Sequence, residues 1–369
     1  KNDYNLNIPR YIDSQEEEDL QDIEAHLLGG IPKRDIEALE KYWTVYPSLK
    51  SQLFKPLQSR PDYCQLIILK EEIKKTIFQH PEFAAFSKNM EKVFETWRAE
   101  TTSYTKALDK GLYPKQVIHI ISENLLKYYT GKQLTDKYAM YQHLMDYWTE
   151  TMQDDMYELA AAGWKAGNEV KRLKKKAKSE SKGEAKEVPG IQGLEGRLIP
   201  PALLIQEYFS EEQANIDALE TQVETLISKM EELREEHGGD EGLLTNAMDD
   251  KQKISKKSLQ TALKDLGKRN FDNAEEYDML QNYKKLMEEQ SVIQTKIGAA
   301  LYALEALLIK KYPVLSIDEI KTIVVDKKWM FNIEQRIHTE MDNISHRLTQ
   351  RIKELAERYE VPLPKQTDE

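Results

Sequence analysis

The residues that could do chemistry are few in this sequence, and their spacing does not bring them together. The single cysteine, Cys64, stands beside the apolar run QLIIL and is expected to be a small buried side chain rather than a nucleophile. His338 and His346 lie eight residues apart on one expected helix, too far to bind one metal ion. Asp154 and Asp155 are neighbours, so on a helix their carboxylates diverge by about 100° and a surface or capping role is expected. No catalytic or metal-ligating residue can be nominated.

Two short motifs lack the context that a cofactor site needs. The glycines of GIQGLEG, at Gly190, Gly193 and Gly196, follow a basic segment and no strand, so they predict a flexible turn rather than a dinucleotide loop. The stretch IPPA, Ile199–Ala202, has two prolines like the motif of DNA amino-methylating enzymes. It lacks the polar side chain that would hold the target amine and the aromatic ring that would stack a flipped base. It predicts the start of a helix, and no cofactor-binding residue is assigned.

The elements that would position a site are mainly helices. Apolar residues make up 40% and charged residues 32% of the 369 residues, and the 15 glycines and 13 prolines are few, which favours long solvated helices over an all-β fold. The apolar spacing predicts helices over Glu16–Leu28, Pro32–Tyr46, Gln65–Phe78, Phe83–Thr101, Pro114–Tyr129, Leu134–Gly163, Ser210–His237 and Asn273–Lys311, then a short helix capped by Ser316 and a last one from Asp326 to Tyr359.

One strand is predicted, at the start of the chain. In Asn2–Asp13, Tyr4, Leu6 and Ile8 alternate with polar residues, and Pro9 removes a donor and closes the strand. A strand needs a neighbour for its backbone groups, and the rest of the sequence predicts none. The predicted fold class is therefore all-α, a helical array followed by long antiparallel helices or a coiled coil, with one strand left over from an α/β domain.

The charge pattern divides the chain into four predicted parts. Residues 1–13 form the strand, 14–164 the helical array, 165–196 a basic flexible linker and 197–369 the long-helix bundle. Although the net charge is −11, Lys165–Lys186 holds nine bases against three acids, so this segment could contact phosphate locally. The candidate DNA contacts are Lys171, Arg172, Lys174, Lys175 and Lys176. The alternative for such a charge run is a solvated spacer.

A regular heptad marks the helix predicted after the basic segment. Its apolar residues step by three and four in strict alternation, at Ile216, Leu219, Val223, Leu226, Met230 and Leu233. Two uses are open for this stripe. It can pack inside the chain, on the helices predicted over Asn273–Lys311 and Asp326–Tyr359, or part of it can dock on a partner helix.

An ordered set of stretches resembles one known family. NDYNLNIPRYID and GGIPKRDIEALEKYWTVYPSL resemble the region after the catalytic domain in modification subunits of type I restriction-modification systems. The stretches HPEFAAF, KYAMYQHLMDYW, GLEGRLIPPALLIQEYF, VVDKKWMFNIEQRI and LTQRIKELAERYEVPLP extend the resemblance, to a long-tailed variety of these subunits, over most of the chain.

This resemblance implies an assembly role rather than chemistry. In the family an upstream domain binds S-adenosylmethionine and methylates adenine N6, so the first strand is expected to join that domain to a helical tail. The tail is expected to dock on the specificity subunit and to help enclose double-stranded DNA in a complex that includes the restriction subunit. No residue of the catalytic or cofactor motifs has a counterpart here, so none is carried over.

The same features predict the cellular compartment and leave alternative functions open. One cysteine allows no internal disulfide, and no apolar run approaches the roughly 18 residues that span a bilayer, so a cytoplasmic protein with no membrane partner is expected. The rivals are a self-contained coiled-coil scaffold with no link to DNA, an independent nucleic-acid-binding module and a complete enzyme. A complete scaffold would have no reason to begin on an unpaired strand.

Overall fold

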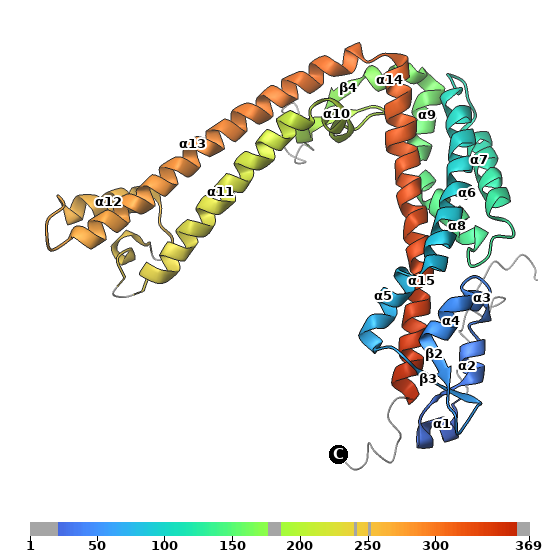
Figure 1. Cartoon of the computed structure of the whole chain (residues 1–369). Coiled ribbons are helices and arrows are strands. Elements are labelled where there is room, and N and C mark those ends of the chain that lie inside the picture. Colours follow the sequence, from blue (N-terminus) through green and yellow to red (C-terminus); the bar gives the residue numbers. More distant parts are fainter. Residues whose placement is uncertain (1–20, 176–185, 240–241, 250–251, 360–369) are drawn as a thin grey trace, which may run out of the picture. The chain divides into compact units, whose positions relative to one another are not determined.

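The described part of the chain is mainly α-helical, as the sequence predicts (Figure 1). The computed structural model describes residues 21–175, 186–239, 242–249 and 252–359, so the strand predicted over residues 2–13 lies outside the described residues. The chain divides into two compact units. The first contains residues up to Tyr104, Lys115–Glu150 and the chain from Met330 onward, and the second contains Thr105–Pro114 and Thr151–Trp329. The units therefore do not follow chain order, because the last helix belongs with the first part of the sequence.

The first unit is built around its C-terminal helix. Its helices are α1 (Ile23–Leu28), α2 (Lys33–Glu37), α3 (Glu40–Trp43), α4 (Pro47–Leu53), η2 (Lys70–Glu72), α5 (Ile73–Phe78), α6 (Pro81–Lys106, whose end enters the second unit), α7 (Pro114–Tyr129), α8 (Lys137–Tyr147), η3 (Trp148–Met152) and α15 (Phe331–Tyr359). Helix α15 packs on α5 and α8. The apolar stripe predicted for it is buried, at Ile333, Ile337, Met341, Ile344, Leu348, Ile352, Leu355 and Tyr359. A 3.6-residue period thus buries one whole face of this helix.

A small antiparallel sheet lies among these helices, and the sequence did not predict it. Strands β1 (Ile31–Pro32), β2 (Phe54–Pro56) and β3 (Tyr63–Leu66) pair in the order β1-β3-β2. The helices predicted over Pro32–Tyr46 and Gln65–Phe78 are therefore wrong in part. The first is broken into α2 and α3, and the second begins as strand and becomes helical at Lys70, where η2 leads into α5. A four-residue strand beside the run QLIIL is too short to show a period of two.

The second unit consists of a small base and a long helical hairpin. Its elements are α9 (Gln153–Ala162), η4 (Trp164–Asn168), β4 (Val170–Arg172), η5 (Ile191–Gly193), β5 (Leu194–Gly196), α10 (Pro201–Tyr208), α11 (Ser210–His237), η6 (Thr245–Ala247), α12 (Lys256–Leu266), α13 (Ala274–Lys311), η7 (Tyr312–Val314), α14 (Ile317–Lys321) and the π-helix η8 (Thr322–Met330). Helices α11 and α13 lie side by side as an antiparallel pair, called here the α11–α13 hairpin, with α12 at its far end (Figure 1).

The far end of the hairpin has its own hydrophobic core. Side chains from α11, η6, α12 and α13 are buried together there, namely Met230, Leu244, Ala247, Leu259, Ala262, Leu280 and Tyr283. Helix α12 begins with a capping box, in which the Ser255 and Ser258 side chains bond each other's backbone N–H. The sequence did not predict this helix. Its core closes the hairpin, because two long helices joined by a loop alone would fray at the open end.

At two predicted helix starts, the residue expected to cap the helix does not do so. Helix α11 begins at Ser210, as predicted, but its N-cap is Phe209 and no side chain caps it, so the capping-box pattern that Ser210 and Gln213 form in the sequence is not used. Asp326 does not begin the last helix, because it lies inside η8, where its carboxylate is 2.6 Å from Lys106 Nζ. The helical backbone runs through η8 into α15 without a break, so no free N–H groups are left at Asp326 for a cap to satisfy.

A buried ion pair fixes the base of the second unit. Asp155 of α9 and Lys328 of η8 are almost fully buried, and Lys328 Nζ lies 2.8 and 2.7 Å from the two carboxylate oxygens. Lys328 also donates to the Leu198 carbonyl, and Trp329 Nε1 donates to Asp155 at 2.8 Å. Burial raises the pKa of the Asp155 carboxyl, while the Lys328 cation opposes that change. The surface or capping role predicted for Asp155 is therefore wrong.

Removing the cation alone should destabilise this base strongly. In Lys328→Met the Asp155 carboxylate loses its buried partner, and we expect the free energy of unfolding in urea at pH 7 to fall by about 3–5 kcal/mol. The deficit should be smaller at pH 5, because the unpaired carboxyl can then take up a proton. The control is Lys327→Met: Lys327 is 55% exposed and lies 3.6 Å from Glu207, so it should cost less than about 1 kcal/mol. Equal losses in the two variants would contradict this account.

Candidate functional site

The described residues hold one Ser–His–acid set, but its hydrogen bonds run opposite to those of a catalytic triad. The Ser48 hydroxyl lies 3.3 Å from His80 Nε2, and the Glu82 backbone N–H donates to His80 Nδ1 at 3.2 Å, so Nδ1 accepts and cannot donate to the carboxylate.

Among the described residues, no three His, Cys, Asp or Glu side chains are placed to hold a metal ion. Cys64 is buried in β3, and this burial raises the pKa of its thiol. His338 faces Glu334 at 3.8 Å, and the His346 ring contacts Phe78. The candidate sites are therefore surfaces, and the second unit carries those that the sequence singled out.

The basic segment is ordered on both sides of residues 176–185, so the predicted flexible linker is wrong for its described parts. Strands β4 and β5 form an antiparallel pair in which Lys171 stands opposite Glu195. Beyond these strands, the backbones of Lys174 and Glu187 form an isolated antiparallel β-bridge, and the Lys175 N–H donates to the Lys186 carbonyl. Gly190 takes a positive φ of 80° before η5, the left-handed conformation that glycine adopts without strain. The glycines predicted as a flexible turn are thus part of this paired segment, residues 170–175 and 186–196, which is called here the ribbon.

The five candidate DNA contacts do not form one patch. Lys171 pairs with Glu195 at 3.0 Å. Arg172 donates to the Val188 and Gly190 carbonyls and pairs with Glu305 of α13, so its charge is used inside the fold. Lys174 and Lys175 are exposed, and Lys176 lies outside the described residues. Successive strand residues face opposite sides, so Lys174 and Lys175 point apart.

The heptad stripe of α11 is mostly core. Ile216, Val223, Leu226 and Met230 are buried, and Leu219 and Leu233 are half-buried. The stripe packs on α13, so the prediction that it packs inside the chain is confirmed for this helix. The second helix predicted to contact it, α15, belongs to the other unit. These side chains are not available to a partner unless the hairpin opens. The stripe therefore holds the hairpin together rather than forming its docking surface.

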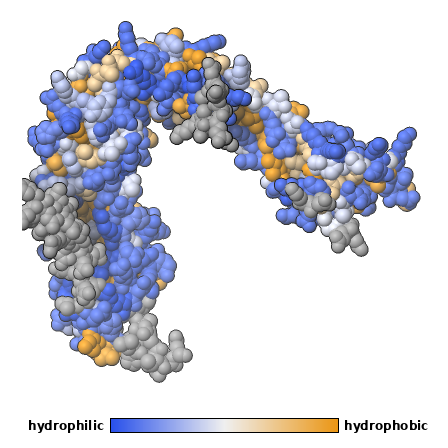
Figure 2. Space-filling model, turned by 180° about the vertical axis from the view of Figure 1, so that it is seen from behind, coloured by the Kyte–Doolittle hydropathy of each residue, from blue (hydrophilic) through white to orange (hydrophobic). Residues whose placement is uncertain are grey.

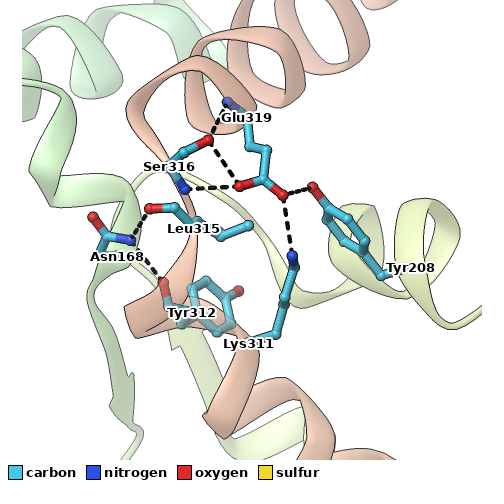
Figure 3. A network of polar contacts seen from close by, with 7 residues as sticks. All are labelled: Asn168, Tyr208, Lys311, Tyr312, Leu315, Ser316 and Glu319. Carbon is cyan, nitrogen blue, oxygen red and sulfur yellow. Dashed lines mark hydrogen bonds and ion pairs between the residues drawn. The ribbon is translucent and has the colours of Figure 1, made fainter.

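The end of α13 is held by a polar network, called here the joint (Figure 3). Pro313 ends the helix, because it has no N–H to donate, and η7 follows. The helix end leaves carbonyls without partners, and Asn168 Nδ2 donates to those of Tyr312 and Leu315 at 2.8 Å each. Ser316 and Glu319 then start α14 with the predicted capping box. The sequence thus located the turn but not its partner Asn168.

Glu319 is the centre of the joint. Its carboxylate accepts from the Ser316 backbone N–H and hydroxyl at 2.8 Å each, from Tyr208 of α10 at 2.8 Å and from Lys311 of α13 at 3.1 Å (Figure 3). These donors lower the pKa of Glu319 to about 2, chiefly through the backbone bond of Ser316. Lys311 also lies 3.8 Å from the centre of the Tyr208 ring. One carboxylate therefore ties three helices together.

Helix α13 has a second apolar face that is largely exposed among the described residues. Val292, Tyr302 and Ile309 are 55%, 75% and 41% exposed, and Figure 2 shows apolar surface along part of the hairpin. By length and composition alone the helix Ala274–Val314 could cross a membrane, and only 11% of its most apolar segment is buried. The sequence had suggested no such segment, because Lys296 and Glu305 interrupt the apolar run. This exposed apolar face needs an explanation outside the hairpin core.

Comparisons with protein-family models, with curated proteins and with solved structures found no match.

The joint should make the stability of the fold depend on acid pH. A carboxyl whose pKa is lowered by folding stabilises the protein above its unfolded-state value near 4.5, and this stabilisation is lost as the pH falls towards about 2. We therefore expect Glu319→Gln to be less stable than the wild type at pH 7 and to lose less stability between pH 4.5 and 2. Asp318→Asn, which changes an exposed carboxylate in the same turn, is the control. Urea unfolding across this pH range measures the effect; parallel curves for the wild type and Glu319→Gln would refute it.

Proposed function

We propose that this chain is the C-terminal assembly region of a DNA adenine-N6 methyltransferase subunit of a type I restriction-modification system. It docks on the specificity subunit and helps to enclose double-stranded DNA, in a cytoplasmic complex that also contains the restriction subunit. S-adenosylmethionine is bound by the catalytic domain of the parent subunit and not by these residues. The ordered family-like stretches, from GGIPKRDIEALEKYW to LTQRIKELAERY, support the assignment to this class of protein.

The observation that carries an assembly role is the α11–α13 hairpin. It is a two-helix element of 28 and 38 residues, closed at one end by the α12 core and anchored at the other by the joint. Such a hairpin does not need an apolar outer face for its own folding, since its core is already filled by the α11 stripe. The outer face of α13 nevertheless carries exposed apolar side chains. Surfaces of this kind mark interaction sites.

The assembly role predicts a stable complex with the specificity subunit. When the two chains are co-expressed, we expect them to copurify and to elute together at an equimolar ratio, because helix-to-helix docking buries apolar surface that is exposed in the free chain. Light scattering coupled to gel filtration gives the mass of the complex. A chain that associates only with itself would instead favour the self-contained scaffold.

Of the five candidate DNA contacts, the proposal retains Lys174 and Lys175, which are exposed. Each phosphate contact releases counterions, so neutralising a contacting lysine should make the plot of log affinity against log salt shallower by about 0.9. Because the two side chains face opposite sides of the ribbon, we expect this change in only one of Lys174→Gln and Lys175→Gln. Binding is measured by fluorescence anisotropy with the assembled complex.

Two further variants provide the controls for this measurement. Lys171→Gln removes a charge already paired with Glu195, and Lys268→Gln removes an exposed charge beyond α12, so both should keep the wild-type slope. If the slope is unchanged in both Lys174→Gln and Lys175→Gln, the ribbon is a spacer and does not contact DNA.

A further inference from the structure

The outer face of α13 has the spacing of a helix-pairing surface. Its side chains follow one another by three and four residues in strict alternation, at Val292, Thr295, Ala299, Tyr302, Ala306 and Ile309. We call this series the outer stripe. Such alternation lines up along one side of a helix over about five turns and is the pattern that two paired helices share.

The outer stripe points away from the hairpin core. Leu304 and Leu308 are buried and mark the inner side of α13. Ala306 is two residues from each of them, and a helix turns by about 100° per residue, so Ala306 lies on the opposite side. Tyr302, two residues before Leu304, lies there too and is 75% exposed. The inner and outer stripes are therefore separate surfaces of one helix.

We propose that the outer stripe binds an amphipathic helix of another protein whose apolar stripe is bordered by acidic residues. The proposal rests on the proposed function, because it names the surface that meets the specificity subunit. Ala299, Ala303 and Ala306 have small side chains, so a second helix can approach closely around Tyr302. Beside Tyr302, a hollow of about 480 Å³ between α13 and the ribbon, lined also by Leu301 and Pro189, offers space for a projecting side chain.

The charges beside the stripe specify the partner. Lys296 and Lys310 are exposed and lie two heptads apart on the same edge of the stripe, and no ion pair among the described residues involves either of them. On the other edge Glu305 is already paired with Arg172. Flanking positions of paired helices select partners by charge, so two free lysines favour Asp or Glu on the incoming helix.

The same charges argue against two other occupants. In a symmetric antiparallel pair of two copies, Lys296 of one copy would face Lys310 of the other, which is repulsive. An anionic membrane would attract the two lysines, but α11 lies against α13, and Ile205–Glu236 holds ten acids against two bases. A membrane is an extended surface, so adsorption would bring this acidic helix within about one Debye length of the lipid headgroups, whereas a single helix docked on the outer stripe contacts α13 alone.

The test compares Asp substitutions of exposed apolar side chains in the full chain. Tyr302→Asp and Val292→Asp place a charge in the stripe, whereas Phe271→Asp changes an aromatic residue that is 98% exposed and lies outside it. All three should melt like the wild type, because the sites are on the surface. Calorimetry with the purified specificity subunit should show at least about tenfold weaker binding for the two stripe variants and unchanged binding for Phe271→Asp.

Charge reversal and two alternative probes complete the test. Lys296→Glu combined with Lys310→Glu should weaken binding and reverse its dependence on salt, because like charges then face each other and added salt screens their repulsion. Unchanged binding by folded Tyr302→Asp would overturn the outer stripe while leaving the assembly role intact, and no binding by the wild type would overturn both. If the wild type floats with phosphatidylglycerol vesicles and Tyr302→Asp does not, the stripe binds lipid. If the wild type sediments as a dimer and Tyr302→Asp does not, the stripe binds a second copy. Either result would overturn the proposal.

Discussion

The carboxylate of Glu319 is the interaction on which the second unit depends. A helix of 38 residues ends at Lys311, and Pro313 prevents it from continuing. The chain must therefore turn, and a turn at a helix end leaves backbone carbonyls that need donors. Asn168 supplies two of these donors, and Glu319 gathers Tyr208, Lys311 and the start of α14 around one anion. Because these groups come from different elements, the base of the hairpin is fixed from several sides.

A fixed base determines what the hairpin can do with its apolar surface. Two helices that pair along their length bury one stripe each, and the heptad stripe of α11 packs on α13 in this way. Helix α13 carries apolar residues on two sides, so pairing with α11 leaves one side uncovered. Exposed apolar area costs solubility without adding to the stability of the hairpin. An exposed apolar face on a helix that is anchored in this way is best explained by a contact with another molecule.

The sequence predicted the strongly periodic elements and missed those held by distant contacts. The stripe of α15, the ends of α11 and α13, and the capping box at Ser316 follow from local spacing and turn chemistry, and they were predicted. The sheet formed by β1, β2 and β3 was not, because its strands have two to four residues and acquire their identity from pairing across the chain. Likewise the local sequence suggested a surface role for Asp155, and only the fold brings Lys328 and Trp329 to it.

The same contrast explains which candidate surfaces changed. A regular heptad such as that of α11 is the easiest pattern to find, but its regularity reflects a requirement to pair, and the nearest long helix satisfies that requirement first. Arg172 looked like one cation among five, yet strand pairing places it beside Glu305. Among the described residues, Lys174, Lys175 and the outer stripe belong to the parts of these patterns that the fold leaves exposed. Spacing in a sequence shows that a surface must be covered, and only the packing of the chain shows which surfaces are still open.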